Sequence, residues 1–122
     1  MHPFQKLEVW RQAHEFALTC YHQAKSIPDH AIRWQLQRAA QAIPANLAEG
    51  AGSQSQAEFW RYIGIAIASA KETEYHLLFA RDADLLPVDT YRVLENALNN
   101  LTPRLVALRS AVRHNAERRT KP

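Results

Sequence analysis

Apolar side chains recur at a strict helical spacing along the last third of the chain, and this feature constrains the fold most. They step alternately by three and four residues, through Tyr91, Leu94, Leu98, Leu101, Leu105, Leu108 and Val112. A repeat of about 3.5 residues sustained over several heptads is typical of a helix that packs against other helices along a continuous seam. The chain is therefore predicted to be built from packed helices.

Three further segments of the 122-residue chain repeat apolar residues at helical spacing. Together with the first they predict helices over residues 7–26, 29–51, 55–82 and 87–116. Asp29 is a typical N-cap residue, and Ser55 begins a Ser-x-x-Glu capping box with Glu58. Short connections between long helices favour antiparallel neighbours. We expect an all-α protein, an antiparallel up-and-down four-helix bundle over residues 1–116, followed by a basic C-terminal tail over residues 117–122.

Prolines and glycines lie in or beside the predicted helices. Pro44 and Pro103 each remove a backbone donor, so each is expected to kink its helix or to divide it in two. Gly50 and Gly52 are expected to end the second helix, and Gly64, inside the third, is expected to allow close helix contact.

Few residues support catalysis or metal binding. The single cysteine, Cys20, falls within the apolar rows of the first helix, and we expect a buried structural thiol there. The chain contains no glycine-rich phosphate-binding motif and no Cys/His set with zinc-ligand spacing. No Glu precedes a His by three positions, the spacing of di-metal sites in bundles. We therefore expect no enzymatic activity, no metal and no cofactor.

The hydrophobic segments are short. The longest, residues 62–70, has nine residues, whereas a helix that crosses a bilayer needs about 20. A single cysteine fits a reducing compartment. We expect a cytoplasmic protein with no membrane association.

Positive charge is concentrated at the C-terminal end. The net charge is +3, but residues 104–122 hold six cations and one anion, and the preceding residues hold nine cations and eleven anions. The six cations are Arg104, Arg109, Arg113, Arg118, Arg119 and Lys121. Such a cluster can contact the phosphates of a nucleic acid. The alternative is a solvated helix end whose cations complement the helix dipole.

A second polar pattern borders the apolar stripes of the second and third helices. Its members are Arg38, Asn46, Glu49, Arg61 and Glu72. Like-handed flanks of antiparallel helices face each other, which places Arg38 level with Glu72. In the same register Glu49 lies near Arg61, so we predict charge-assisted pairs across this seam. We favour an ion-pair ladder that sets helix register, and the alternative is a polar groove for a ligand or partner.

Three strings of residues resemble a known family. They are Phe4-x-x-Leu7-x-Val9-Trp10-x-x-Ala13, Gln35-Leu36-x-Arg38-Ala39-Ala40-x-x-Ile43-Pro44-Ala45-Asn46-Leu47-Ala48-Glu49-Gly50 and Ser55-x-x-Glu58-Phe59-x-x-Tyr62-x-x-Ile65-Ala66-x-x-Ser69-x-x-Glu72-x-Glu74. The chain resembles the bacterial four-helix bundle family whose members include proteins encoded in intervening sequences of large-subunit ribosomal RNA genes. More distantly, it is similar to accessory proteins of diversity-generating retroelements.

The resemblance implies a non-enzymatic bundle that forms homopentamers. The retroelement proteins are pentameric barrels that bind nucleic acid and a reverse transcriptase, so the resemblance also implies these partners. This chain departs from the family after Gly50, where relatives often carry Arg or Lys and it reads Ala51-Gly52-Ser53-Gln54. Natural phosphate contacts at that helix end are therefore missing, and the basic C-terminal segment is the remaining cluster.

Two functions follow from these observations. The first is an oligomeric accessory protein that binds RNA or DNA through its basic C-terminal helix end. The second is a protein–protein interaction or assembly module with no nucleic-acid role, whose surface aromatics, such as Trp34 and Trp60, join subunits or bind a reverse transcriptase or another protein.

Overall fold

The computed structural model describes the backbone of residues 4–120 and the side chains of residues 4–113. A short 3-10 turn, η1, precedes four long helices, and the described part of the chain contains no strand. The elements are η1 (Phe4–Lys6), α1 (Glu8–Ala24), α2 (His30–Ala51), α3 (Gln56–Asp82) and α4 (Val88–Thr120). The predicted all-α class is confirmed.

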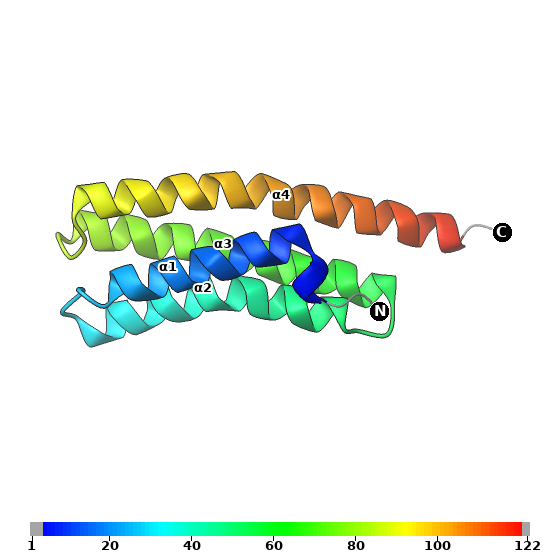
Figure 1. Ribbon diagram of the computed structural model, residues 1–122, viewed down its shortest axis with the longest axis horizontal. Coiled ribbons are helices and arrows are strands. Elements are labelled where there is room, and N and C mark those ends of the chain that lie inside the picture. Colours follow the sequence, from blue (N-terminus) through cyan, green and yellow to red (C-terminus); the bar gives the residue numbers. More distant parts are fainter. Residues whose placement is uncertain (1–3, 121–122) are drawn as a thin grey trace.

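The four helices form an up-and-down bundle. Successive helices run in alternate directions, so the α1–α2 and α3–α4 turns lie at one end and the α2–α3 turn lies at the other (Figure 1). Helix α1 packs against α2 and α4, and α3 packs against the same two helices from the opposite corner. This arrangement follows from the short turns, because a chain that reverses after each helix places consecutive helices side by side.

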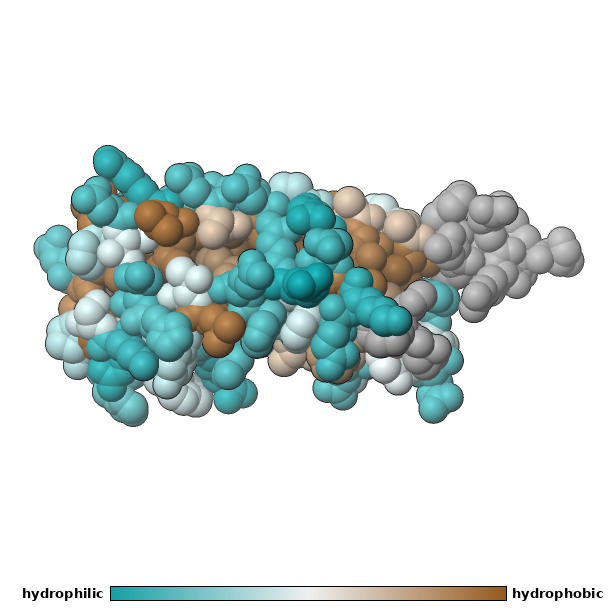
Figure 2. All heavy atoms as spheres, in the orientation of Figure 1, coloured by the Kyte–Doolittle hydropathy of each residue, from teal (hydrophilic) through white to brown (hydrophobic). Residues whose placement is uncertain are grey.

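The heptad stripe of α4 lies in the centre of the bundle. Leu94, Leu98, Leu101 and Leu105 are at most 1% exposed. Burying a leucine side chain contributes about 1.5–3 kcal/mol, so this stripe is a main source of stability. The face seen in Figure 2 is mostly hydrophilic, with separate apolar patches along α4. The helical periodicity of the sequence thus identifies the core.

The core stripe of α3 contains one polar residue. Thr73 is fully buried, and its hydroxyl donates to the carbonyl of Ser69 one turn earlier at 2.7 Å. A buried hydroxyl without a partner costs free energy, and this local bond removes that cost.

Side-chain caps set two helix starts as predicted. Asp29 accepts a hydrogen bond from the amide of Ile32 at 3.0 Å, and Ser55 accepts one from the amide of Glu58 at 3.1 Å. Helix α4, in contrast, continues to Thr120, past its expected end at residue 116. The first residues of the predicted tail are therefore helical, and residues 121–122 lie outside the described part of the chain.

Neither proline divides its helix. Pro44 lies inside α2 and Pro103 inside α4, and both helices are continuous. The indole Nε1 of Trp10 in α1 donates to the carbonyl of Pro44 at 3.1 Å, which ties α1 to α2 at this position.

Gly50 serves close helix contact. Its φ is not positive, so its position does not depend on the left-handed region. A Cβ atom there would lie 2.6 Å from the Cβ of Tyr62 and 3.0 Å from a ring carbon of Phe59. The last turn of α2 and the first turns of α3 therefore approach closely because residue 50 has no side chain.

Candidate functional site

The C-terminal cations do not form one cluster where the structure describes them. Arg104 is exposed and donates to Oε1 of Gln12 on α1. Arg109 and Arg113 instead lie near α3, where both guanidinium groups are over the ring of Trp60. The side chains of Arg118 and Arg119, and all of Lys121, lie outside the described residues. The three described cations of the C-terminal segment, Arg104, Arg109 and Arg113, therefore lie beside two different helices.

Arg109 is a helix–helix contact. Its guanidinium carbon lies 3.7 Å from the centroid of the Trp60 ring, and its Nε donates to the Trp60 carbonyl at 3.2 Å. A Cβ atom at Gly64, one turn further along α3, would lie 2.6 Å from Nη2 of Arg109. Gly64 thus leaves the space that Arg109 fills. The close contact expected at Gly64 is confirmed, and it is made by the Arg109 side chain of α4 packing on α3.

Arg113 is exposed and lies one turn after Arg109 on the same face. Its guanidinium carbon is 5.4 Å from the Trp60 centroid. Sequence reasoning assigned Trp60 to a surface that joins subunits, whereas here the ring is half-buried under Arg109. Trp60 and Gly64 are four residues apart, so they are neighbours on one face of α3. An aromatic ring next to a residue without a side chain is the pattern in the sequence that could have predicted this contact.

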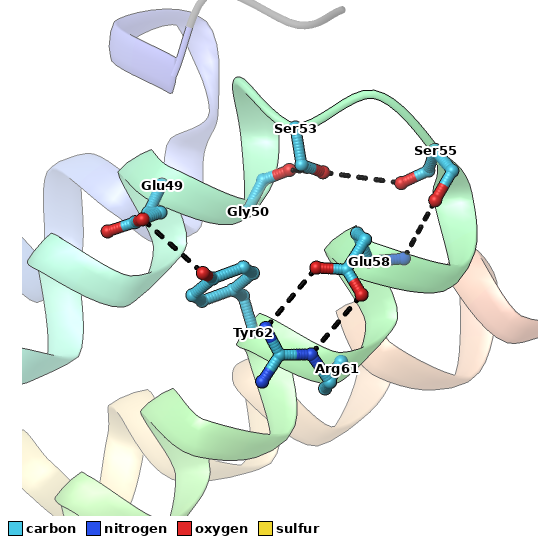
Figure 3. Close-up of polar contacts among 7 residues, drawn as sticks. All are labelled: Glu49, Gly50, Ser53, Ser55, Glu58, Arg61 and Tyr62. Atoms are coloured by element: carbon cyan, nitrogen blue, oxygen red, sulfur yellow. Dashed lines mark hydrogen bonds and ion pairs between the residues drawn. The ribbon is translucent and has the colours of Figure 1, made fainter.

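The predicted ion pairs across the α2–α3 seam are wrong. Arg61 pairs with Glu58 in its own helix, at 3.2 and 3.3 Å, and its guanidinium carbon lies 4.5 Å from the Tyr62 centroid (Figure 3). Glu49 accepts a hydrogen bond from the Tyr62 hydroxyl at 3.3 Å. Glu49 thus contacts the first turns of α3, as predicted, but its partner there is Tyr62 and not Arg61. Asn46 donates to a backbone carbonyl one turn back in α2, at 2.8 Å.

The other end of the seam shows the same preference for local partners. Arg38 places its guanidinium carbon 5.2 Å from the ring centroid of Trp34, in α2. Glu72 lies 3.4 Å from Nε2 of His76, in α3. Arg38 and Glu72 do not pair. Partners three or four residues away on one helix are already adjacent, so they satisfy a long side chain with less ordering than a partner on another helix.

The α2–α3 turn carries an open depression that contains two carboxylates. It is lined by Ala48, Glu49, Gly52, Ser53, Gln54, Glu58 and Tyr62. Glu58 is paired with Arg61, and no Arg or Lys lines the depression itself, so the depression offers no contact for a phosphate. The geometry agrees with the absence of Arg and Lys after Gly50 in the sequence.

The described residues offer no metal site. Within that part of the chain, no three His, Cys, Asp or Glu side chains gather closely enough to hold an ion. None of the helices described has an apolar stretch of the length that crosses a bilayer. Cys20 is fully buried, and burial raises the pKa of its thiol from 9.0 to about 12. A thiol held in its neutral form is a packing group.

Comparison with known proteins identifies the family. Residues 5–107 match the family model of the 23S rRNA-intervening sequence protein. The chain belongs to this family. The match extends from η1 into α4 and ends before Arg109.

A solved structure shares the fold of this family member. It is a protein with unknown function from the S23 ribosomal protein family of Bacteroides thetaiotaomicron, 25% identical in sequence, with a TM-score of 0.78. The similarity covers 82% of this chain and 96% of that chain. No protein with curated annotation matches this one.

Proposed function

We propose that this protein is a non-enzymatic, self-assembling bundle whose copies associate through the outer face of α3. The observation that carries the proposal is the exposure of two large rings, Tyr75 and Phe79, on that face. The outer stripe to which they belong consists of Arg61, Ile65, Ala68, Glu72, Tyr75, Phe79 and Asp82. Each member lies two positions after a residue of the buried stripe, which places it about 200° around the helix and directly opposite the core.

Large apolar side chains occupy this outer stripe. Tyr75 is 58% exposed and Phe79 is 43% exposed, and their ring centroids lie 6.3 Å apart. Leu78 extends the apolar surface at 38% exposure, and Ile65, at 36%, lies on the other side of Glu72 in the stripe. Contiguous exposed apolar residues on a soluble protein mark an interaction site. Their 3.5-residue spacing is the one by which a further helix packs.

Five copies are the expected number, and this number rests on the family resemblance. The outer face of α3 points away from α1, its diagonal neighbour in the bundle. When one face of a copy contacts a different face of the next, the contact is heterologous, and such contacts close into rings. A ring also repeats any basic surface around its axis, which strengthens weak binding to a polymer.

Multi-angle light scattering tests this proposal. We expect the wild type at a multiple of its 14.0 kDa chain mass, close to five, and the variant Tyr75→Glu/Phe79→Glu at the mass of one chain. Charge placed in an apolar contact carries a large desolvation cost. Because both rings are exposed in the single chain, the variant should keep its helical circular dichroism.

Val93→Glu is the matched control, since Val93 is 59% exposed but belongs to α4. It should leave the mass unchanged, and high salt should not dissociate the wild type. A wild type that elutes as a single 14.0 kDa chain at all accessible concentrations contradicts the proposal.

The basic end of α4 favours nucleic-acid binding as a second function. Helix α4 extends beyond the other helices at the C-terminal end (Figure 1), and residues 104–122 of the sequence carry six cations and one anion. Arg109 and Arg113 both lie over the ring of Trp60, so the cations after Arg113 in the sequence are the proposed phosphate contacts.

Charge-removing substitutions test this second function better than truncation, because Leu105 and Val112 belong to the core. We expect Arg118→Gln/Arg119→Gln/Lys121→Gln to weaken RNA binding and to lower the slope of log K against log salt by about 0.7 for each lost contact to a single strand. Arg92→Gln, at an exposed position at the other end of α4, is the control. Equal salt slopes for the wild type and the triple variant contradict the assignment.

A further inference from the structure

An aromatic and cationic surface lies where α1 and α2 meet, and neither function above uses it. We propose that this α1–α2 face, defined by Tyr21, Lys25, Trp34 and Arg38, binds single-stranded nucleic acid. Bases stack on Tyr21 and Trp34, and Lys25 and Arg38 bind the phosphates. The inference is independent of the proposed assembly, since it involves no residue of the outer face of α3.

Each aromatic ring of this face is exposed and has a cation beside it. Tyr21 is 45% exposed, with the Lys25 ammonium nitrogen 5.1 Å from its ring centroid. Trp34 is 51% exposed, with the guanidinium carbon of Arg38 5.2 Å from its centroid. Proteins that bind single strands combine aromatic rings, which stack on any base, with cations that follow the phosphates. Here both parts are repeated on two adjacent helices.

The four residues lie close together along the bundle. The side-chain amide of Gln37 donates to the carbonyl of Tyr21 at 3.0 Å, so these two residues lie level across the α1–α2 seam. Trp34 is one turn before Gln37, and Lys25 is one turn after Tyr21. Because the helices are antiparallel, both steps lead toward the same end of the bundle. The two rings therefore frame one end of the seam.

A hollow of about 320 Å³ continues along the seam from these rings. It is lined by His14, Ala17, Leu18, Tyr21, Gln37, Gln41 and Pro44. Its volume lies at the lower end of the range for small-ligand pockets, about 300–1,000 Å³. The amides of Gln37 and Gln41 offer both donors and acceptors, which suits the edges of any base.

The charge of this face complements a polyanion. No carboxylate lines the hollow. In α1 the row that faces the hollow is His14, Leu18, Tyr21 and Lys25, and Glu15 projects roughly 90° away from it. Asp29, at the start of α2, is occupied as the helix cap. A phosphate on this face therefore meets two cations, beside a hollow that no carboxylate lines.

The experiment measures binding of a short fluorescein-labelled single-stranded RNA to the full chain by anisotropy. We expect Trp34→Ala and Tyr21→Ala each to weaken binding about 5- to 150-fold, the loss of one stacked base. Trp34→Phe keeps a ring for stacking and should restore most of the affinity. Arg38→Gln should lower the salt slope by about 0.7, whereas the matched Arg92→Gln should not.

Three outcomes overturn the inference. The first is a wild type that does not bind the single strand. The second is binding that is lost in Arg118→Gln/Arg119→Gln/Lys121→Gln but kept in Trp34→Ala, which assigns the nucleic acid to the C-terminal end. The third is a Trp34→Ala protein that binds the strand like the wild type but changes its mass in light scattering, because the face then belongs to a contact with a second copy.

Unchanged mass and helicity in Trp34→Ala, together with weaker binding, support the inference. Loss of the oligomer in Tyr75→Glu/Phe79→Glu is a separate result. If the assembly proposal fails, the proposed binding of nucleic acid at the α1–α2 face is unaffected, and failure of that binding does not affect the assembly proposal.

Discussion

At the scale of single residues, long cationic side chains in this protein bind to what lies nearest. Arg109 fills the gap at Gly64 and stacks on Trp60, and Arg61 turns to Glu58 one turn away. The Trp60 ring is half-buried, so its contact orders one flexible side chain. Arg61 and Glu58 are both exposed, but their spacing on one helix already places them side by side. Positive charge in the sequence therefore overstates the charge that is free to bind a ligand.

Cys20 gives a prediction at this scale. Because burial raises the pKa of its thiol to about 12, the native protein should not react with a thiol reagent such as dithionitrobenzoate below pH 9.0, the ordinary pKa. The unfolded thiol ionises first, so this group's contribution to the free energy of unfolding is complete below pH 9.0 and declines as the pH rises toward 12.

The measurement is the absorbance of the released thiol product, with and without guanidinium chloride. Full reaction should require the denaturant. Rapid and complete labelling of the native protein would show that the helix opens around Cys20, in conflict with its complete burial.

At the scale of elements, the α3–α4 turn is closed by an aspartate in a conformation that glycine adopts more easily. Asp84 has a φ of 58°, and it is the single non-glycine residue with positive φ in the described part of the chain. The amide of Leu85 donates to the carbonyl of Ala80 at 2.8 Å, and that of Asp84 donates to Arg81 at 3.1 Å. This pair of bonds is a Schellman motif, whose left-handed residue is usually Gly.

Asp84→Gly should therefore stabilise the protein by about 0.5–1 kcal/mol. Glycine relieves the strain of the left-handed conformation, and this gain exceeds the loss that comes from the greater freedom of glycine in the unfolded chain. That gain raises the melting temperature by about 2–4 °C in a chain of this size. Asp84→Ala, which keeps a Cβ atom but loses the polar side chain, should lower it. Melting followed by circular dichroism ranks the three proteins, and a glycine variant less stable than the wild type contradicts the role of backbone strain.

At the scale of the whole molecule, the bundle has three kinds of surface. The outer face of α3 exposes Tyr75, Leu78 and Phe79, the α1–α2 face combines aromatic rings with cations, and the α2–α3 turn carries carboxylates. They lie on different sides of one core, so the proposed assembly and the proposed binding of a polyanion use separate surfaces. Light scattering with and without RNA separates these two activities in a single experiment.

Periodicity and capping predicted the fold well because both are local. The apolar stripe from Tyr91 to Val112 correctly predicts which side of α4 is buried, and Asp29 and Ser55 correctly predict where two helices begin. The candidate sites were predicted less well. Trp34 was grouped with Trp60 as a surface aromatic, and the structure separates them, since Trp34 is 51% exposed and Trp60 lies under Arg109.

By itself, the sequence determined that this protein is an all-α bundle, where its core runs, and that Cys20 is buried, because a repeat of 3.5 residues and a capping side chain act over one or two turns. Only the tertiary structure decided which partner each surface side chain takes. Arg38 lies over Trp34 in its own helix, whereas the register of the sequence predicted Glu72 as its partner. The neighbours that a surface side chain meets depend on helix spacing and rotation, and these are set by the packing of the whole core.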